Sequence, residues 1–430
     1  MKLSEASTQQ LIQSKTELEK EFKKYSDMNL SLNISRGLPC KEQLDLNAEM
    51  FHILDETNCY AEDGTDCRQY GVINGLPECI RLFSELLDIP EKRIILGGES
   101  SLNLMYDEML RLWAFGCMGE EPWSKQAQKQ PLKWLCPVPG YDCHFTLTEK
   151  LGFELISVPM NEDGPDMNLV EKLVADDPAI KGIWCVPQYS NPTGIVYSDE
   201  VVDRLASMKT AAPDFKIIWD NAYAVHHIYK ENIVKDIFKA AMPYGNENRI
   251  LYFFSTAKIT FPGSGVCMMA SGDEMVEETK ELLKLQIFSH DKLNQLRHVK
   301  YLKSPENIRT HMKKVAEILK PRFDVVDEIL QQGKLYDDLY TWFKPDGGYF
   351  ITVDSYPGCA AEILSRLETV GVKVAIQGST FPYHKDPNDS NIRLAPTYPP
   401  MEELITAMKF FCVAAGLVAI EHVLKERGNS

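Results

Sequence analysis

Short apolar runs alternate with longer amphipathic stretches between about residue 50 and residue 300. Seven of these runs are rich in Ile, Val, Phe and Trp: residues 93–97, 133–138, 154–159, 182–186, 216–220, 251–255 and 266–270. Runs of this length are typical of buried strands, and the stretches between them have helical spacing. The alternation predicts an α/β fold in which a seven-stranded, mostly parallel sheet carries helices on both faces.

The two ends of the chain show a different pattern. Residues 5–26 carry apolar side chains at helical spacing, whereas residues 29–49, with Gly37 and Pro39, predict a loop. Residues 305–335 predict a helix that Pro321 should kink or break. Two strand-like pieces (347–353 and 371–376) and a closing helix over 401–425 follow. This second set of elements predicts a smaller α+β domain.

Composition and charge narrow the class of protein. The 430 residues are 44% hydrophobic and 25% charged, which excludes a disordered or collagen-like chain. A net charge of −16 repels phosphate backbones and anionic lipid, so we expect neither nucleic acid nor a membrane as a partner. The longest apolar run, residues 410–420, is too short to cross a bilayer and predicts a buried helix.

The cysteines and histidines give no sign of a disulfide framework or a metal centre. The 11 cysteines are scattered and form no CxxC pair, and the N-terminus lacks the apolar core of a signal peptide. These features predict reduced thiols in a cytoplasmic protein. His226 and His227 have no metal-ligand partners at useful spacing and are interpreted as structural, so we expect no metal. For His144, beside Tyr141, a structural and a functional role both remain open.

The residues that follow the strands are the first place to look for chemistry, because ligands of open parallel sheets bind beyond the carboxyl ends of the strands. Residues 97–101 (Gly-Gly-Glu-Ser-Ser) open a helix and suit a phosphate group, although a serine N-cap explains them equally well. Tyr141, after strand 133–138, is either part of a turn or an aromatic face for a planar ligand. Asn191, before Pro192, follows strand 182–186 in a turn that can carry a cis peptide and aim its amide inward.

Two further strand ends carry ionisable groups. Asp220 ends strand 216–220 with Tyr223 just behind it, and a buried carboxylate is costly unless it pairs with a positive group; a helix N-cap is the alternative. Lys258 follows strand 251–255, a place where a lone lysine is ordinarily solvated. Together, the five strand ends supply a phosphate cradle, an aromatic plate, an amide, a carboxylate with a phenol, and an amine. That set fits pyridoxal phosphate (PLP), a planar cofactor that condenses with a lysine and needs an acid at its ring nitrogen.

Four motifs, in their order and rough spacing, resemble fold-type I aminotransferases. They are Asn191-Pro192-Thr193-Gly194, Asp220-Asn221-Ala222-Tyr223, Ser255-Thr256-Ala257-Lys258 and Ile392-Arg393-Leu394-Ala395-Pro396. Residues 71–78 also look like the entry segment of that family, and residues 32–37, 98–103 and 291–298 look like one aspartate-aminotransferase-like subgroup. The resemblance runs from about residue 30 to 420. It implies the PLP-dependent transferase fold, with a large PLP-binding domain over residues 50–300 and a small domain built from residues 1–49 (N-terminal helix and substrate loop) and 301–430.

The resemblance implies a role for each matching residue. The catalytic group would be Lys258, which forms the Schiff base and moves the proton, Asp220, which pairs with the pyridinium nitrogen, and Tyr223, which donates to the phenolic oxygen of the ring. The remaining cofactor contacts would be Tyr141 (stacking), Asn191 (phenolic oxygen), Ser100, Ser101 and Ser255 (phosphate), and Tyr70 of the partner subunit (phosphate). A homodimer with shared active sites follows from the last contact.

Substrate binding is implied in the same way. Arg393 would clamp the α-carboxylate in a bidentate manner, with Asn191 beside it and Gly37 closing over it. Aspartate and 2-oxoglutarate are the substrates that the resemblance favours, in a ping-pong reaction, and a distal carboxylate would require a second cation. Arg297, Lys292 and Arg36 are candidates for this cation; surface salt bridges are the alternative for Arg297 and Lys292.

One position departs from the family pattern. The family usually has an arginine after the lysine loop to offset the charge of the cofactor phosphate, whereas this chain has Gly265 or Val266 there. We expect hydroxyl and backbone N–H groups to take over, with no other Lys or Arg at the phosphate. The alternatives that the motifs leave open are an aminotransferase for alanine or aromatic amino acids, a PLP lyase on the same fold and, more remotely, a ligand-sensing transcription regulator.

Overall fold

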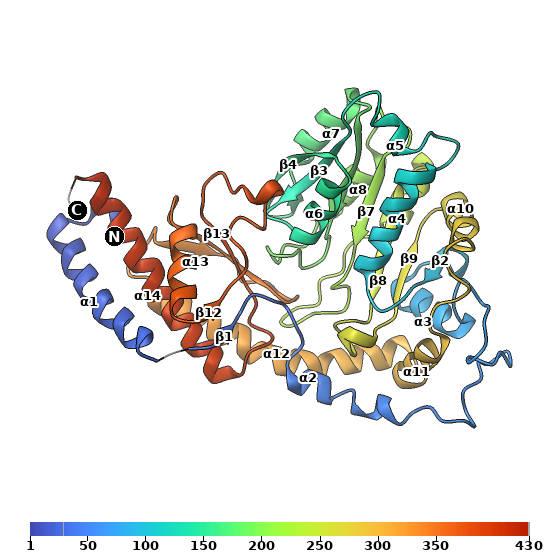
Figure 1. Cartoon of the computed structure of the whole chain (residues 1–430), viewed down its shortest axis with the longest axis horizontal. Coiled ribbons are helices and arrows are strands. Elements are labelled where there is room, and N and C mark those ends of the chain that lie inside the picture. The colour runs from blue at the N-terminus through green and yellow to red at the C-terminus, as the bar shows by residue number, and fades with distance from the viewer. Residues whose placement is uncertain (29, 429–430) are drawn as a thin grey trace.

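A mixed eight-stranded sheet forms the larger part of the molecule in the computed structural model, which describes residues 1–28 and 30–428 (Figure 1). Its strand order is β2-β9-β8-β7-β6-β3-β4-β5. The bounds are Ile94–Leu96 (β2), Lys133–Val138 (β3), Glu154–Asn161 (β4), Gly164–Pro165 (β5), Ile180–Cys185 (β6), Lys216–Asp220 (β7), Ile250–Ser255 (β8) and Cys267–Ala270 (β9). The seven predicted strands are therefore confirmed, and β5 is a two-residue addition that pairs antiparallel with β4.

The directions of these strands decide where their ends meet. Strands β4, β3, β6, β7 and β8 run parallel to one another, whereas β9 runs antiparallel to both β8 and β2. Ser255, the last residue of β8, is paired with Cys267, the first residue of β9. The carboxyl ends of β3, β6, β7 and β8 consequently lie at one edge of the sheet, together with the loop that enters β9.

Successive side chains of the strands enter two separate cores, as the pleat of a sheet requires. Ile218 and Phe253 pack with Met105 and Met109 of α4 in one core, whereas Ile217 and Phe254 pack with residues of α3 and α8 in the other. The helices of this part are α3 (Pro77–Leu87), α4 (Ser101–Phe115), α5 (Trp123–Gln126), α6 (Asp142–Lys150), α7 (Met167–Asp176), α8 (Asp199–Ser207), α9 (Ile237–Ala241), α10 (Asp273–Leu283) and α11 (Lys292–Leu302). The predicted coverage of both faces is confirmed.

The smaller part is built from both ends of the chain (Figure 1). An antiparallel sheet has the order β10-β11-β13, and Leu32 of β1 pairs with Val372 of β12. Helix α1 packs along α14, which also packs on α12. The bounds are α1 (Thr8–Ser26), β1 (Leu32–Asn33), α2 (Lys41–Asp45), α12 (Pro305–Gly333), β10 (Tyr340–Trp342), β11 (Ile351–Ser355), α13 (Ala360–Thr369), β12 (Val372–Lys373), β13 (Asn391–Leu394) and α14 (Met401–Glu426). The domain boundaries at residues 49 and 300 remain predictions.

Short 3-10 helices connect several of these elements. Their bounds are Leu3–Glu5, Ala48–Phe51, Glu91–Arg93, Met242–Tyr244, Glu247–Arg249, Pro262–Ser264 and Pro382–His384.

Two expectations for the smaller part need correction. The stretch 29–49 is not only loop, because β1 and α2 lie in it; β1 forms because a strand far along the chain offers it a partner. Helix α12 is continuous across Pro321, so the break considered there does not occur; its neighbours Leu319, Arg322 and Phe323 are buried and hold the helix together. Residue 29 of the predicted loop and residues 429 and 430 of the predicted small domain lie outside the described residues.

Helix α14 also corrects the argument from the apolar run. Its 26 residues are long and apolar enough, by length and composition alone, to cross a membrane, which the 11-residue run by itself is not. However, 78% of its most apolar 18-residue window is buried inside the protein, against α1 and α12 among others. The core helix of a water-soluble protein passes the same test, and the prediction of a buried helix is confirmed.

Candidate active site

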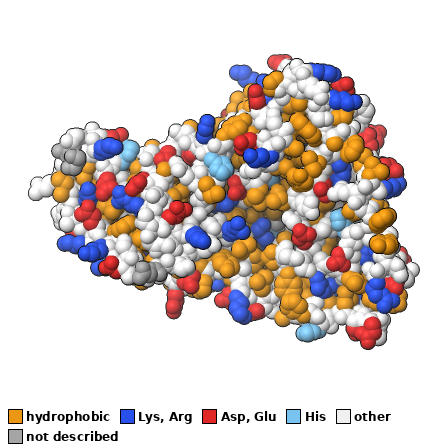
Figure 2. All heavy atoms as spheres, in the orientation of Figure 1, with side chains coloured by type: hydrophobic (Ala, Val, Ile, Leu, Met, Phe, Trp, Pro, Cys, Tyr) orange, Lys and Arg blue, Asp and Glu red, His pale blue; other side chains and the backbone are white. Residues whose placement is uncertain are grey.

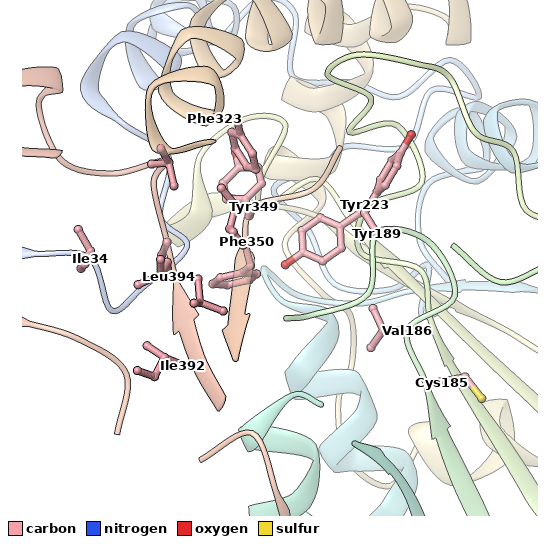
Figure 3. Packing of buried hydrophobic residues seen from close by; sticks show 14 of the residues in the cluster. Ile34, Cys185, Val186, Tyr189, Tyr223, Phe323, Tyr349, Phe350, Ile392 and Leu394 are labelled. Atoms are coloured by element: carbon pink, nitrogen blue, oxygen red, sulfur yellow. The ribbon is translucent and has the colours of Figure 1, made fainter. Parts of the chain in front are cut away.

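Lys258 lies in the loop beyond β8, close to aromatic side chains from both parts of the molecule. Its Nζ is 5.1 Å from the ring centre of Tyr223 and 5.8 Å from that of Tyr349. The rings of Tyr349 and Tyr223 stack with 6.1 Å between their centres, and Figure 3 shows the two side chains in the same region. Burial lowers the pKa of the Lys258 ammonium, an effect that the negative charge of Asp220 opposes. The neutral, nucleophilic amine is therefore favoured more than it is in a solvated lysine.

The backbone at Lys258 is held by two further side chains. His226 Nε2 lies 3.3 Å from the Lys258 carbonyl oxygen, and the Tyr349 hydroxyl donates to the same oxygen at 3.4 Å. Burial lowers the pKa of His226 to about 3, so its imidazole stays neutral. This agrees with the structural interpretation of His226, which supports the reactive lysine through its backbone.

Asp220, at the end of β7, is buried and lies at one end of a row of contacting side chains. His144 Nε2 is 3.2 Å from Asp220 Oδ2, and the His144 ring stacks on Trp184 at 4.2 Å between ring centres. Tyr141 meets the same imidazole edge-on at 4.8 Å. The other carboxylate oxygen, Asp220 Oδ1, is buried without a hydrogen-bond partner in the described part of the chain. A buried acceptor without a partner costs free energy, so this oxygen suits a ligand that donates a proton, such as a protonated pyridine nitrogen.

Tyr223 stays protonated in this environment. Burial raises the pKa of its hydroxyl well above the ordinary value, and the charge of Asp220 acts in the same direction. The group can therefore donate a hydrogen bond near Lys258. With Tyr141 on the far side of His144, the predicted catalytic group and the predicted ring-stacking residue lie in one place.

The serines predicted to hold a phosphate lie on either side of the start of β9. Ser100 is the N-cap of α4 and its Oγ accepts from the backbone N–H of Leu102 at 3.2 Å. Ser101 and Ser255 are both buried. The loops converge at Gly265, where a Cβ atom would lie 2.7 Å from the carbonyl oxygen of Glu99 and 3.1 Å from the backbone nitrogen of Ala257. Both interpretations of Ser100 are therefore compatible: it caps the helix, and its loop lies against the lysine loop.

Arg393 projects from β13 of the smaller part towards residues of the large sheet. Its Nη1 lies 3.2 Å from Asp142 Oδ1 and 3.4 Å from Asn191 Oδ1, and its Cζ is 4.9 Å from the ring centre of Phe350. Its Nε is buried and has no hydrogen-bond partner within residues 1–28 and 30–428, which leaves a donor for an acidic ligand. The Asn191-Pro192 peptide bond is cis, as the sequence allowed.

Gly37 belongs to the same corner of the site. A Cβ atom at this position would lie 2.6 Å from the ring of Phe350, on which the Arg393 guanidinium rests. A side chain at position 37 would push against that ring, so a glycine lets the chain approach closely. The structure thus brings Gly37, Asn191 and Arg393 together.

The three candidate cations for a distal carboxylate differ in their surroundings. Arg36 is exposed, and its charge, like that of Arg393, lowers the pKa of the Cys143 thiol, although burial of that thiol has the larger, opposite effect. Arg297 donates to Ser264 Oγ and Asn294 Oδ1, in the turn that follows Lys258. Lys292 is buried and donates to backbone carbonyl groups, so it is neither a surface salt bridge nor a free cation.

Tyr70 points away from its own protomer. Its side chain is 81% exposed and its ring packs on that of Phe288 at 5.3 Å, which is itself 77% exposed. The position suits a residue that serves a second subunit and does not suit one that serves its own site.

Several residues of this site were not singled out by the sequence. Asp142 and Cys143 follow Tyr141 directly, and Tyr349 and Phe350 begin the predicted strand 347–353. Asp142 could have been flagged as a charge after a strand end, but nothing in a single sequence pairs Tyr349 and Phe350 with Lys258 and Arg393. Their contacts arise only when the smaller part packs against the sheet.

The surface at this point is hollowed between the two parts, with hydrophobic side chains inside and Lys and Arg side chains at its margin (Figure 2). A separate cavity of about 840 Å³ lies between α12 and residues 224–238. None of the predicted site residues lines that cavity, so the candidate active site at the strand ends is separate from it. Residues 1–28 and 30–428 contain no group of three or more His, Cys, Asp or Glu side chains that could hold a metal ion.

A fold of this kind with a buried lysine, an acid on the neighbouring strand and an arginine from the smaller part defines an aminotransferase-like enzyme, and comparison with known proteins bears this out. The sequence matches the family described as "Aspartate amino-transferase" over residues 6–427. An aspartate aminotransferase of Corynebacterium glutamicum is 41% identical over 408 residues, which cover 94% of each chain. The crystal structure of an aspartate transaminase from the same organism has a TM-score of 0.95 at 39% identity and covers 98% of this chain and 99% of that one.

This chain belongs to the aspartate aminotransferase family and is an aminotransferase. A more distant neighbour supports the fold alone: LysN, an α-aminoadipate aminotransferase of Thermus thermophilus solved with N-(5′-phosphopyridoxyl)-L-leucine, has a TM-score of 0.73 at 18% identity. It covers 97% of this chain. The family match along almost the whole chain decides against the remote alternative of a ligand-sensing regulator.

Proposed function

We propose that this aminotransferase uses PLP to move the amino group of aspartate to 2-oxoglutarate, in a homodimer with shared active sites. The observation that carries the proposal is the arrangement of Lys258, Asp220 and Arg393, which come from three distant segments and meet at one edge of the sheet. The relatives named as aspartate aminotransferases support the choice of aspartate. Alanine, aromatic amino acids or a lyase reaction are the alternatives.

The residues fit PLP in their donors and acceptors. Asp220 Oδ1 is the unpartnered acceptor for the pyridine N–H, Tyr141 is the aromatic plate, and the hydroxyl of Tyr223 is a donor held protonated by burial. When bound, PLP supplies an electron-withdrawing ring that stabilises negative charge at the substrate Cα. The crystal structure of LysN with a phosphopyridoxyl compound supports the same cofactor for this fold.

Lys258 is the group that takes up and returns the proton. Its lowered pKa keeps a larger fraction of the amine neutral near pH 7, and only the neutral amine can bond to a carbonyl carbon or accept a proton. Asp220 would place its carboxylate close to the ring nitrogen, and His144 Nε2 lies 3.2 Å from the other carboxylate oxygen. The aromatic rings of Tyr223 and Tyr349 limit the directions from which water reaches the amine.

The phosphate would lie at Ser100, Ser101 and Ser255, with backbone N–H groups at the N-terminus of α4. We revise the expectation that no other cation contributes. Arg297 reaches the turn at Ser264, next to the position where the family usually has its phosphate arginine, and its buried Nε has no partner in the part of the chain that the structure describes. We therefore assign Arg297 to the cofactor phosphate and leave Arg36, near Arg393, as the candidate for a distal carboxylate.

The dimer and the location of the protein rest on surface features. Tyr70, Phe288 and Leu285 are large apolar side chains with 77–81% of their surface exposed, which is unusual unless another chain covers them. All 11 cysteines are free and every one except Cys143 is buried, which supports the cytoplasm as the compartment.

An acidic protein of net charge −16 must gather positive groups locally to bind acidic substrates, and Arg36, Arg297 and Arg393 do so.

A substrate screen tests the proposal. The holoenzyme is mixed with each amino acid in turn, and the absorbance of the bound cofactor is followed as it takes the amino group. Aspartate should convert the cofactor with the highest kcat/KM, and 2-oxoglutarate should restore the starting spectrum. No spectral change with any amino acid would overturn the proposed function, whereas conversion by alanine alone would move the specificity to the alternative.

A further inference from the structure

Lys292 is a buried cation that is poorly explained by the helix to which it belongs. It is the first residue of α11 and is only 3% exposed. No carboxylate forms an ion pair with it in the part of the chain that the structure describes. A positive charge at a helix N-terminus opposes the helix dipole, and a buried charge without an acid partner is costly. Its placement therefore calls for another reason.

The Lys292 ammonium donates three hydrogen bonds, two to the loop that contains Tyr70 and one to Ser289. Nζ donates to the carbonyl oxygens of Gln69 and of Gly71, the latter at 3.0 Å, and to Ser289 Oγ at 3.2 Å. Gln69 and Gly71 are the residues on either side of Tyr70. The ammonium is thus hydrogen-bonded to the backbone immediately before and after this tyrosine.

The backbone conformation of this loop is one that outside contacts must stabilise. Gly71 has φ +100° and Val72 has φ +59°, so two consecutive residues are in the left-handed region, and the second is β-branched. That conformation is costly for valine and persists only where contacts outside the loop enforce it. Gln295, also on α11, accepts from the backbone N–H of Leu76 at 2.8 Å and holds the far end of the loop.

The result is a tyrosine fixed in an outward direction. Tyr70 is 81% exposed although hydrogen bonds hold the backbone on both sides of it, and its ring packs on the exposed ring of Phe288. An exposed aromatic side chain on a rigid, strained backbone is pre-organised for a partner surface.

We infer that Lys292 is a positioning residue that presents Tyr70 to the active site of a second copy of this chain, where the tyrosine hydroxyl donates to the cofactor phosphate. The inference rests on the proposed PLP-dependent homodimer. It means that the Lys258 site of one subunit depends on Lys292 of the other.

A hybrid dimer tests this dependence across the interface. Lys292→Met removes the three hydrogen bonds in a side chain of similar length, and Lys258→Ala inactivates a site while leaving its Tyr70 loop intact. In the Lys292→Met homodimer, we expect the cofactor to leave the holoenzyme on the order of tenfold faster, because a hydrogen bond to a charged group is lost. In the hybrid, one subunit carries Lys292→Met and the other carries Lys258→Ala. The site that keeps Lys258 then receives Tyr70 from the Lys258→Ala subunit, in which Lys292 is intact. Cofactor release from that site should therefore return to the wild-type rate.

The other outcomes are distinct. If the hybrid, shown by sedimentation to be a dimer, keeps the fast release of the Lys292→Met homodimer, Lys292 acts within its own subunit and the inference is wrong. If wild-type holoenzyme is a monomer with normal cofactor retention, the shared-site dimer is wrong and this inference with it. Lys300→Met, on the same helix, is the matched control and should release the cofactor at the wild-type rate.

A second variant guards against loss of folding. Lys292→Gln keeps N–H donors and should show the same pattern with a smaller change. A Tyr70→Phe background supplies a further readout, because Lys292→Gln should add no further effect on cofactor release there. An additive effect would show that Lys292 does not act through Tyr70.

Discussion

His144 Nε2 lies 3.2 Å from Asp220 Oδ2, and both side chains are buried beneath the active site. The imidazole is stacked on Trp184, so its orientation is fixed independently of any ligand. Asp220 therefore has Oδ2 beside the imidazole, whereas Oδ1 has no hydrogen-bond partner among the described residues. This contact favours a role for His144 at the proposed site over a purely structural one.

Replacing His144 should weaken the hold on Asp220 without removing its charge. We expect His144→Asn to lower kcat about tenfold, because Asp220 loses the imidazole that lies 3.2 Å from its Oδ2 and a small displacement of a positioned group slows a reaction. The measurement is kcat with aspartate, alongside the absorbance maximum of the bound cofactor, which should shift because Asp220 faces the ring nitrogen. An unchanged spectrum together with unchanged kcat would return His144 to a purely structural role.

Replacing Arg393 by lysine should separate charge from geometry. Arg393→Lys keeps the positive charge but loses the forked pair of donors that matches a carboxylate. We expect kcat/KM for aspartate to fall by a factor of about 10 to 100, chiefly through KM, if one charge-assisted hydrogen bond is lost. Cofactor release should stay at the wild-type rate. A loss of cofactor retention of similar size would contradict the assignment of Arg393 to the substrate.

Arg297 distinguishes two assignments of the second cation. In Arg297→Met, we expect PLP to be lost about tenfold faster, because the variant removes a positive charge beside the turn at Ser264, where we propose that the phosphate lies. The ratio of kcat/KM for aspartate to kcat/KM for alanine should not change. A selective loss for aspartate, with normal retention of the cofactor, would instead place Arg297 at the distal carboxylate, and Lys300→Met is the control on the same helix.

The lowered pKa of Lys258 predicts a pH-dependent stability of the cofactor-free protein. Between the depressed folded pKa and the unfolded value of about 10.5, the unfolded chain binds more protons than the folded chain, so stability rises with pH in that window. Cofactor-free Lys258→Met lacks this penalty. Its Tm should exceed that of cofactor-free wild type at pH 7, and the difference should shrink as the pH approaches 10.5. A constant difference across this range would contradict the lowered pKa.

The core elements of the large sheet were predictable because their signals are local. Each of the seven strands is an apolar run with a turn or a helix at its end, and the β-α alternation imposes parallel neighbours whose carboxyl ends meet at one edge. That rule is sufficient to place Asn191, Asp220 and Lys258 together, although they are far apart in the sequence. Strand β5 was missed because two residues carry no pattern.

The pattern failed where a segment depends on a distant partner. Strand β1 forms because Leu32 pairs with Val372, and α12 continues across Pro321 because buried side chains on both sides hold it. Local propensity alone predicts a loop in the first case and a possible break in the second.

The sequence by itself determined the fold class and the family and named candidate residues for the chemistry, since strand periodicity and short motifs are properties of contiguous residues. Only the tertiary structure decided what those residues touch. It set Arg393 against Asn191 and Asp142, moved Arg297 to the turn after Lys258, and turned Lys292 from a candidate ligand of substrate into the clamp of Tyr70. These contacts join segments tens to hundreds of residues apart, and their geometry is fixed by how helices and sheets pack, which no local pattern encodes.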